Sequence, residues 1–169
     1  MSTPYDFEDG TRGHYARAIG YLTMGWATLE ICLDFAIAIA FQRCGGNALE
    51  PEIPRSFSRK VTFLRKSFQQ LESLREFETQ GIALLDRASE LSDTRHTVVH
   101  GAISAVEGAV IKLHRIFYSP QSHRAERANI ELNDVWICAS DVTDLAHQLA
   151  DFVALMVSKF HGPEHGPLL

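Results

Sequence analysis

Residues 19–41 read IGYLTMGWATLEICLDFAIAIAF. Apolar side chains recur in this stretch at alternating spacings of three and four residues, which predicts a long α-helix from about His14 to Gln42. A second apolar set, at Ile31, Phe35 and Ile39, lies off that stripe. A helix that is apolar on more than one side is either central to its own bundle or shared with a second subunit. The main stripe consists of Ile19, Leu22, Trp26, Leu29, Leu33, Ala36 and Ala40.

The same stretch is the most hydrophobic part of the chain, and we interpret it as a buried helix. Its section from Trp26 to Phe41 is shorter than the roughly 20 residues that a membrane span needs. It also contains Glu30 and Asp34. The first dozen residues carry acids and lack an apolar run, so we expect no export signal. The 3 cysteines form no C-x-x-C pair, which is typical of reduced thiols. We therefore expect a cytoplasmic protein with no membrane partner.

Two further helices follow by the same spacing argument. Residues 45–47, Gly-Gly-Asn, tolerate positive φ and end the first helix. A second helix is predicted to begin near Ser56 or Ser58, with its basic residues outside, and a third to span about 81–100. Gly101 stands where a C-cap glycine would end the third helix. The positions expected to point inward are Val61, Leu64, Phe68, Leu71, Leu84, Ala88, Leu91, Thr94 or Arg95, and Val98.

The pattern then becomes β-like. Apolar and β-branched residues predict a short hairpin at about 102–119, and residues 128–137 are a candidate third strand. The polar stretch from Ser119 to Arg127 has no periodicity and is predicted to be a loop. Ser140 or Asp141 is expected to cap a last helix that ends near residue 160. Its inward residues are predicted to be Val142, Leu145, Leu149, Phe152 and Met156.

Together these elements predict a mainly α protein: an up-and-down helical bundle with a small β-hairpin before the last helix. The length of 169 residues and the 46% hydrophobic content fit a single domain over 1–169. The bundle is expected over 14–160, with the hairpin region at about 102–137. The ends, 1–13 and 161–169, are expected to be loose.

Charge is spread unevenly along the chain. The net charge of -5 at pH 7 argues against indiscriminate nucleic-acid binding. Residues 51–127, however, hold 12 Lys and Arg against 9 Asp and Glu. Within them lies a series of basic residues without an acid, which is either a solvated helix face or a surface that contacts phosphates. This series, here called the basic run, consists of Arg55, Arg59, Lys60, Arg65 and Lys66.

The segment with chemical content is Arg95-His96-Thr97-Val98-Val99-His100-Gly101, at the end of the third predicted helix. Arginine offers a fixed fork of donors for a phosphate and keeps its charge at neutral pH. Histidine titrates near neutrality and can transfer a proton. Arg95 and His100 together therefore suit attack of a ribose 2′-hydroxyl on the adjacent phosphodiester, a reaction that needs no metal.

This segment resembles the R-x4-H signature of the HEPN superfamily, in which a polar residue follows the arginine. The pattern Trp26-Ala27-Thr28-Leu29-Glu30 in the first helix and the pair His100-Gly101 are similar to those of bacterial members. The resemblance implies a helical bundle that acts as a metal-independent endoribonuclease in toxin–antitoxin or phage-defence systems. It implies a homodimer with two motifs facing one composite cleft, no cofactor, and an antitoxin or nucleotidyltransferase as partner. Transferred to this chain, His100 is the general acid/base, Arg95 binds the phosphate, His96 orients the pair, and Glu30 holds Arg95.

Several alternatives stay open. Some toxin members continue the motif as H-x-Y, whereas Ala102 stands at that position here. Arg95 and His100 could serve only to cap a helix end, which would make the chain a catalytically inactive, dimeric interaction or regulatory module. The i, i+4 spacing of His96 and His100 is also metal-ligand spacing. A third ligand would then come from His114 or His123.

Overall fold

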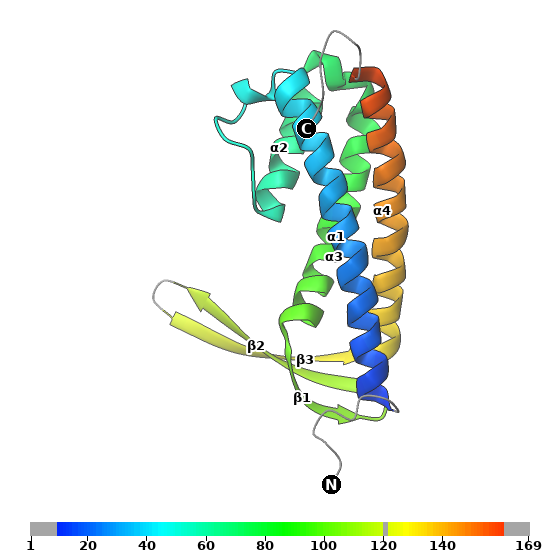
Figure 1. Ribbon diagram of the computed structural model, residues 1–169. Helices are drawn as coiled ribbons and strands as arrows, with labels where there is room; N and C mark the ends of the chain where they lie inside the picture. Colours follow the sequence, from blue (N-terminus) through cyan, green and yellow to red (C-terminus); the bar gives the residue numbers. More distant parts are fainter. Residues whose placement is uncertain (1–9, 120–121, 161–169) are drawn as a thin grey trace. The chain divides into compact units, whose positions relative to one another are not determined.

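The computed structural model describes residues 10–119 and 122–160, and helix makes up most of it (Figure 1). Helix accounts for 74% of the structure, which confirms the mainly α class. Two short 3₁₀ segments, Gly46–Ala48 and Glu72–Phe77, flank the second α-helix. In chain order, the other elements are α1 (Thr11–Arg43), α2 (Phe57–Gln70), α3 (Glu78–His100), β1 (Ala102–Glu107), β2 (Val110–Ser119), β3 (Ser122–Glu131) and α4 (Leu132–Phe160).

The chain packs as two compact units whose boundaries fall inside α1, α3 and α4. The first unit comprises the residues up to 25 and those from 90 to 143. It contains the start of α1, the end of α3, the three strands and the start of α4. The second unit comprises residues 26–89 and those from 144 onward. The motif of α3 therefore belongs to the first unit. The basic run, which lies in α2 apart from Arg55, belongs to the second.

The sheet of the first unit is antiparallel, in the order β1-β2-β3. A two-residue turn joins β1 to β2, and Gly108 adopts φ 60° there, a conformation that glycine takes without strain. β1 pairs only with Val110–His114, whereas β3 pairs with the whole of β2. Residues 115–119 and 122–126 therefore form a two-stranded ribbon beyond the end of β1. Ile111 and Leu113 of β2 are buried in the core of this unit.

The C-terminal turn of α3 is held by contacts within the first unit. The buried Tyr15 of α1 donates its hydroxyl to the Val98 carbonyl at 3.2 Å. Burial raises the pKa of Tyr15 to about 12, so this hydroxyl stays a donor at physiological pH. Gly101 follows the helix directly, and a Cβ there would lie 2.7 Å from the Thr97 carbonyl oxygen and 3.0 Å from Leu113 Cβ. The glycine is thus required by close packing between α3 and β2 and not by a positive φ.

The core of the second unit is aromatic and aliphatic. Phe152 of α4 makes edge-to-face contacts with Phe68 and Phe77, each at a centroid distance of 5.7 Å. Gly81 lets α3 approach the Phe68 ring, because a Cβ at this position would lie 2.7 Å from that ring. The predicted apolar stripe supplies other buried residues of this unit: Trp26, Leu29, Leu33, Ala36 and Ala40.

The structure confirms helices close to three of the predicted segments and corrects several boundaries. α1 begins at Thr11, so the expected loose lead-in over 1–13 is wrong from residue 11 onward. Gly45 has φ 82° just after α1, as the sequence predicts. The expectation of a loop from Ser119 to Arg127 is wrong, because β3 begins at Ser122. The remaining predicted loose residues, at the two ends, lie outside the described part of the chain apart from Gly10.

The last helix begins earlier than the sequence predicts. β3 ends at Glu131 and α4 starts at Leu132, so most of the candidate strand at 128–137 is helical. Ser140 and Asp141 lie inside α4 and do not cap it. The start of α4 is fixed from outside the helix, because Leu132 N–H donates to the Ala109 carbonyl of the β1–β2 turn at 2.9 Å. The inward residues predicted for this helix are nevertheless all buried: Val142, Leu145, Leu149, Phe152 and Met156.

α1 is long and apolar enough to cross a membrane when judged by length and composition alone. Half of its most hydrophobic 18-residue window is buried inside the protein. The core helix of a soluble protein passes the same test. The sequence-based interpretation of α1 as a buried helix therefore stays a prediction.

Candidate functional site

The R-x4-H motif brings its two key side chains together at the end of α3. Arg95 Nη1 lies 3.4 Å from His100 Nε2. A guanidinium only donates, so this contact is a hydrogen bond when His100 Nε2 carries no proton. His100 is exposed and Arg95 is half-buried. The motif thus presents a solvent-accessible imidazole whose reactive nitrogen is held next to a fixed positive charge.

His96 completes the motif one helical turn before His100. The two imidazole rings lie 4.6 Å apart between centroids. The pKa of His96 is lowered from 6.5, first because the surrounding protein desolvates the ring. The positive charges of Arg115, His100 and Arg95 lower this pKa further, and Asp93 opposes them. His96 therefore favours its neutral form, in which it can accept or donate a hydrogen bond without adding charge.

The sheet contributes a basic residue that sequence reasoning missed. Arg115 of β2 donates from Nη1 to the Thr97 hydroxyl at 3.4 Å, and that hydroxyl donates in turn to the Asp93 carbonyl at 3.0 Å. The strand register explains the approach, because Ala102 pairs with His114. One further step along this register places Arg115 opposite Gly101, directly after the motif. No local sequence signal marks this residue, since its position depends on pairing between β1 and β2.

No triad of metal ligands accompanies the two motif histidines. Within residues 10–119 and 122–160, no group of three or more His, Cys, Asp or Glu side chains is arranged to hold a metal ion. His114 is exposed and adjoins Arg115 along β2, so its side chain points to the opposite face of the sheet. The side chain of His123, the other candidate third ligand, lies outside the described residues.

No family model, curated protein or solved structure matches this chain. The resemblance to the HEPN superfamily therefore depends on the quoted motifs. What the chain's own geometry adds is the close approach of Arg95 and His100 and the exposure of His100.

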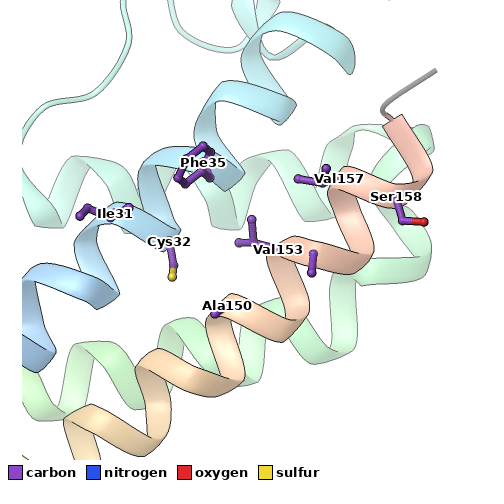
Figure 2. Close-up of a pocket in the computed structure, with 8 residues that line it drawn as sticks. Ile31, Cys32, Phe35, Ala150, Val153, Val157 and Ser158 are labelled. Atoms are coloured by element: carbon purple, nitrogen blue, oxygen red, sulfur yellow. The ribbon is translucent and has the colours of Figure 1, made fainter. Parts of the chain in front are cut away.

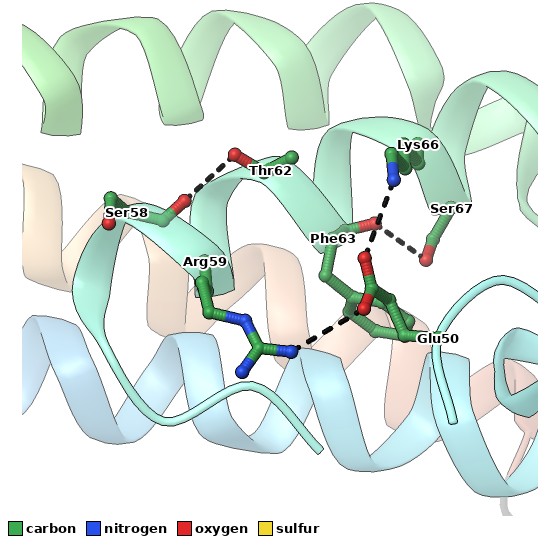
Figure 3. A network of polar contacts seen from close by, with 7 residues as sticks. All are labelled: Glu50, Ser58, Arg59, Thr62, Phe63, Lys66 and Ser67. Atoms are coloured by element: carbon green, nitrogen blue, oxygen red, sulfur yellow. Dashed lines mark hydrogen bonds and ion pairs between the residues drawn. The ribbon is translucent and has the colours of Figure 1, made fainter. Parts of the chain in front are cut away.

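The basic run of α2 is largely matched by acids that lie elsewhere in the sequence (Figure 3). Glu50 accepts from Arg59 at 3.5 Å through one carboxylate oxygen and from Lys66 at 3.4 Å through the other. Arg65 pairs with Asp86 of α3 at 2.6 Å. Such pairs lower the positive potential of the run, even though the run itself contains no acid. RNA contact by these residues stays a prediction.

Lys60 departs most clearly from the expected arrangement. The sequence places the whole run on the outer face of its helix, but only 9% of the Lys60 side chain is exposed. Its ammonium group lies 2.7 Å from Asp34 of α1, whose side chain is 53% exposed. A long aliphatic stem lets lysine follow an apolar surface while its charge reaches a carboxylate. Lys60 therefore acts as a link between α2 and α1 within the second unit.

Glu30, expected to hold Arg95, is half-buried on α1. It belongs to the second unit, whereas Arg95 belongs to the first. Their pairing stays a prediction.

The second unit also carries an apolar groove between α1 and α4 (Figure 2). The groove has a volume of about 510 Å³ and is apolar except for Ser158 and a thiol. Ile31 and Phe35 line it, and the Ile31 side chain is 56% exposed. Both belong to the second apolar set of the first helix, which the sequence analysis placed off the main stripe. The other lining residues are Cys32, Ala150, Val153, Ala154, Val157 and Ser158.

Proposed function

We propose that this chain is a HEPN-like RNA-binding protein that cleaves RNA without a metal ion, in the cytoplasm of a bacterium. The observation that carries the proposal is the contact of Arg95 Nη1 with His100 Nε2 at 3.4 Å, on an exposed histidine. The motif resemblance supplies the reaction class and the setting, a toxin–antitoxin or phage-defence system. A cognate antitoxin or nucleotidyltransferase is the expected partner.

In the proposed reaction, the ribose 2′-oxygen attacks the adjacent phosphorus and the bond from phosphorus to the 5′-oxygen breaks. A neutral His100 accepts the proton of the 2′-hydroxyl. The 5′-oxygen leaves with a proton from a general acid, which the second His100 of a homodimer would supply. Arg95 donates to the phosphate oxygens as negative charge develops on them. The products are a 2′,3′-cyclic phosphate and a 5′-hydroxyl. Within the basic run, the exposed Arg55 and Arg59 are the side chains we expect to reach the RNA backbone.

The test is incubation of the purified protein with a mixed RNA pool in EDTA, beside His100→Ala. We expect cleavage by the wild type alone, with cyclic phosphate at the new 3′ ends. His147→Ala is a matched control, because His147 is an exposed histidine of α4 outside the motif. Cleavage that requires an added metal would contradict the mechanism, as would equal cleavage by His100→Ala.

The alternative function is a catalytically inactive, dimeric interaction or regulatory module with the same fold. The apolar groove favours it, because exposed apolar surface of this kind is typical of a face that packs against another protein chain. In this case Ile31→Asp, at the groove, would convert a dimer into a monomer in light scattering. His100→Ala would then change neither the oligomeric state nor any RNA-dependent readout.

A further inference from the structure

Basic side chains from two different elements converge at the end of α3. Arg95, His96 and His100 come from the helix, and Arg115 comes from β2. Arg115 and Arg95 both act on His96, since the charge of each lowers its pKa. The guanidinium groups of Arg95 and Arg115 carry the same permanent charge, and positive charges that lie near one another favour binding of an anion.

The sheet orients Arg115 toward the motif. Side chains alternate between the two faces of a strand, so Arg115 shares its face with the buried residues Ile111 and Leu113. The Thr97 hydroxyl accepts from its guanidinium on this face. Glu126, the cross-strand neighbour of Arg115, makes an ion pair with Arg124. Arg115 is half-buried and lies where the pairing of β1 with β2 has ended, at the base of the two-stranded ribbon.

We propose that Arg115 is a second phosphate-binding arginine of this site and binds a backbone phosphate next to the one held by Arg95. The inference rests on the proposed RNA function and assigns a binding residue that the R-x4-H motif does not contain. A guanidinium presents a planar fork of donors that matches two phosphate oxygens. A guanidinium carries five N–H donors, and its contact with the Thr97 hydroxyl uses one of them. Two arginines from different elements would hold two successive phosphates and fix the register of the strand over His100.

The test measures binding of a fluorescent single-stranded RNA whose 2′-hydroxyls are all O-methylated, because this RNA cannot be cleaved by 2′-oxygen attack. Affinity is followed by fluorescence anisotropy at several salt concentrations for the wild type, Arg115→Gln and Arg127→Gln. Arg127 is the matched control, because it pairs with His114 in the register and is exposed on the opposite face of the sheet. Loss of one phosphate contact on a single strand lowers the slope of log affinity against log salt by about 0.7.

We expect Arg115→Gln to bind several-fold more weakly than the wild type, with the reduced slope, while Arg127→Gln matches the wild type. Equal affinity and slope in the two variants would overturn the role of Arg115 and leave the proposed RNA function standing. Absence of wild-type binding at micromolar protein would overturn both.

If Arg115→Gln melts earlier than Arg127→Gln, the same binding measurement is made with Thr97→Val in place of Arg115→Gln. This variant removes the hydroxyl that orients Arg115 and keeps every charge. Weaker binding with an unchanged slope is then expected, and wild-type affinity would overturn the inference.

Discussion

In the described part of the chain, the basic run and the basic residues at the end of α3 differ in the neighbours that the fold brings to them. In the basic run, carboxylates from other segments approach the cations, as Asp34 approaches Lys60 at 2.7 Å. At the end of α3, basic side chains approach one another: Arg95 lies 3.4 Å from His100, and Arg115 joins them from the sheet. The sequence alone suggests that the basic run is the more positive of the two, because its lysines and arginines lie close together without an acid among them.

The difference shows that charge along a sequence and charge in space are separate properties. A helix face can be rich in lysine and arginine and still be neutral once acids from other elements pack against it. Groups with a shifted pKa, as His96 has at the end of α3, are typical of functional sites. We therefore expect substitutions at the motif to have larger effects on function than substitutions in the basic run.

The largest expected difference is in RNA cleavage. Arg95→Gln should lower the single-turnover rate in EDTA by about 100- to 1,000-fold, because it removes a donor aimed at the developing phosphate charge. Arg59→Gln, in the basic run, should lower the same rate by less than about threefold, since Arg59 can contribute only one screened contact to the RNA backbone. Both variants should keep the wild-type melting temperature. Comparable losses in the two variants would show that total charge matters more than its placement.

The next difference concerns stability within the basic run. Asp34→Asn should lower the free energy of unfolding by about 1–3 kcal/mol, because it leaves the buried Lys60 ammonium without its carboxylate. Asp86→Asn is the control, since its partner Arg65 is more exposed, and the expected loss there is under about 1 kcal/mol. Urea denaturation measures both values. Equal losses would mean that burial of Lys60 does not govern the strength of its pair.

The buried faces of the helices could be predicted from the sequence, and the strand pairing could not. Leu22 and Leu29 of α1 and Leu149 of α4 are buried as predicted, because helical spacing by itself defines which side chains share a face. The first six residues of β3 were missed because they are mostly polar and show no alternation, whereas its last four residues belong to the predicted third strand. It is held by backbone pairing with β2, which leaves no apolar signature.

The start of α4 and the contact of Arg115 with the motif were missed for a related reason. α4 follows β3 with no intervening turn residues, and Leu132 is fixed by the Ala109 carbonyl from a distant turn. Trp136 and Ile137 also favour a strand by intrinsic propensity. Arg115 reaches the motif through the register of β1 with β2. The motif itself could be predicted, because Arg95 and His100 lie close together in the sequence at the end of one helix.

A smaller effect on stability is expected at the hydrogen bond from Tyr15 to the last turn of α3. Tyr15→Phe should lower the free energy of unfolding by about 1 kcal/mol, because it removes a buried hydrogen bond and leaves the Val98 carbonyl unsatisfied. Tyr21→Phe is the control: its side chain is 59% exposed, and its substitution should change stability by close to zero. Guanidinium denaturation of the two variants measures the difference. An unchanged stability in Tyr15→Phe would show that the end of α3 is held by packing alone.

The smallest and most specific effect is in the titration of His96, observed by NMR of its imidazole signals. The pKa should lie below 6.5, and Arg115→Gln should raise it toward that value, whereas Arg127→Gln should leave it unchanged. The pKa of His96 is lower in the folded protein than in the unfolded chain. The free energy of unfolding should therefore be highest above about pH 6.5 and should fall as the pH drops toward the folded pKa. His96→Gln should therefore reduce the dependence of the melting temperature on pH over that interval. A His96 that titrates at its ordinary value in the wild type would mean that neither desolvation nor the neighbouring basic side chains act on this ring in solution.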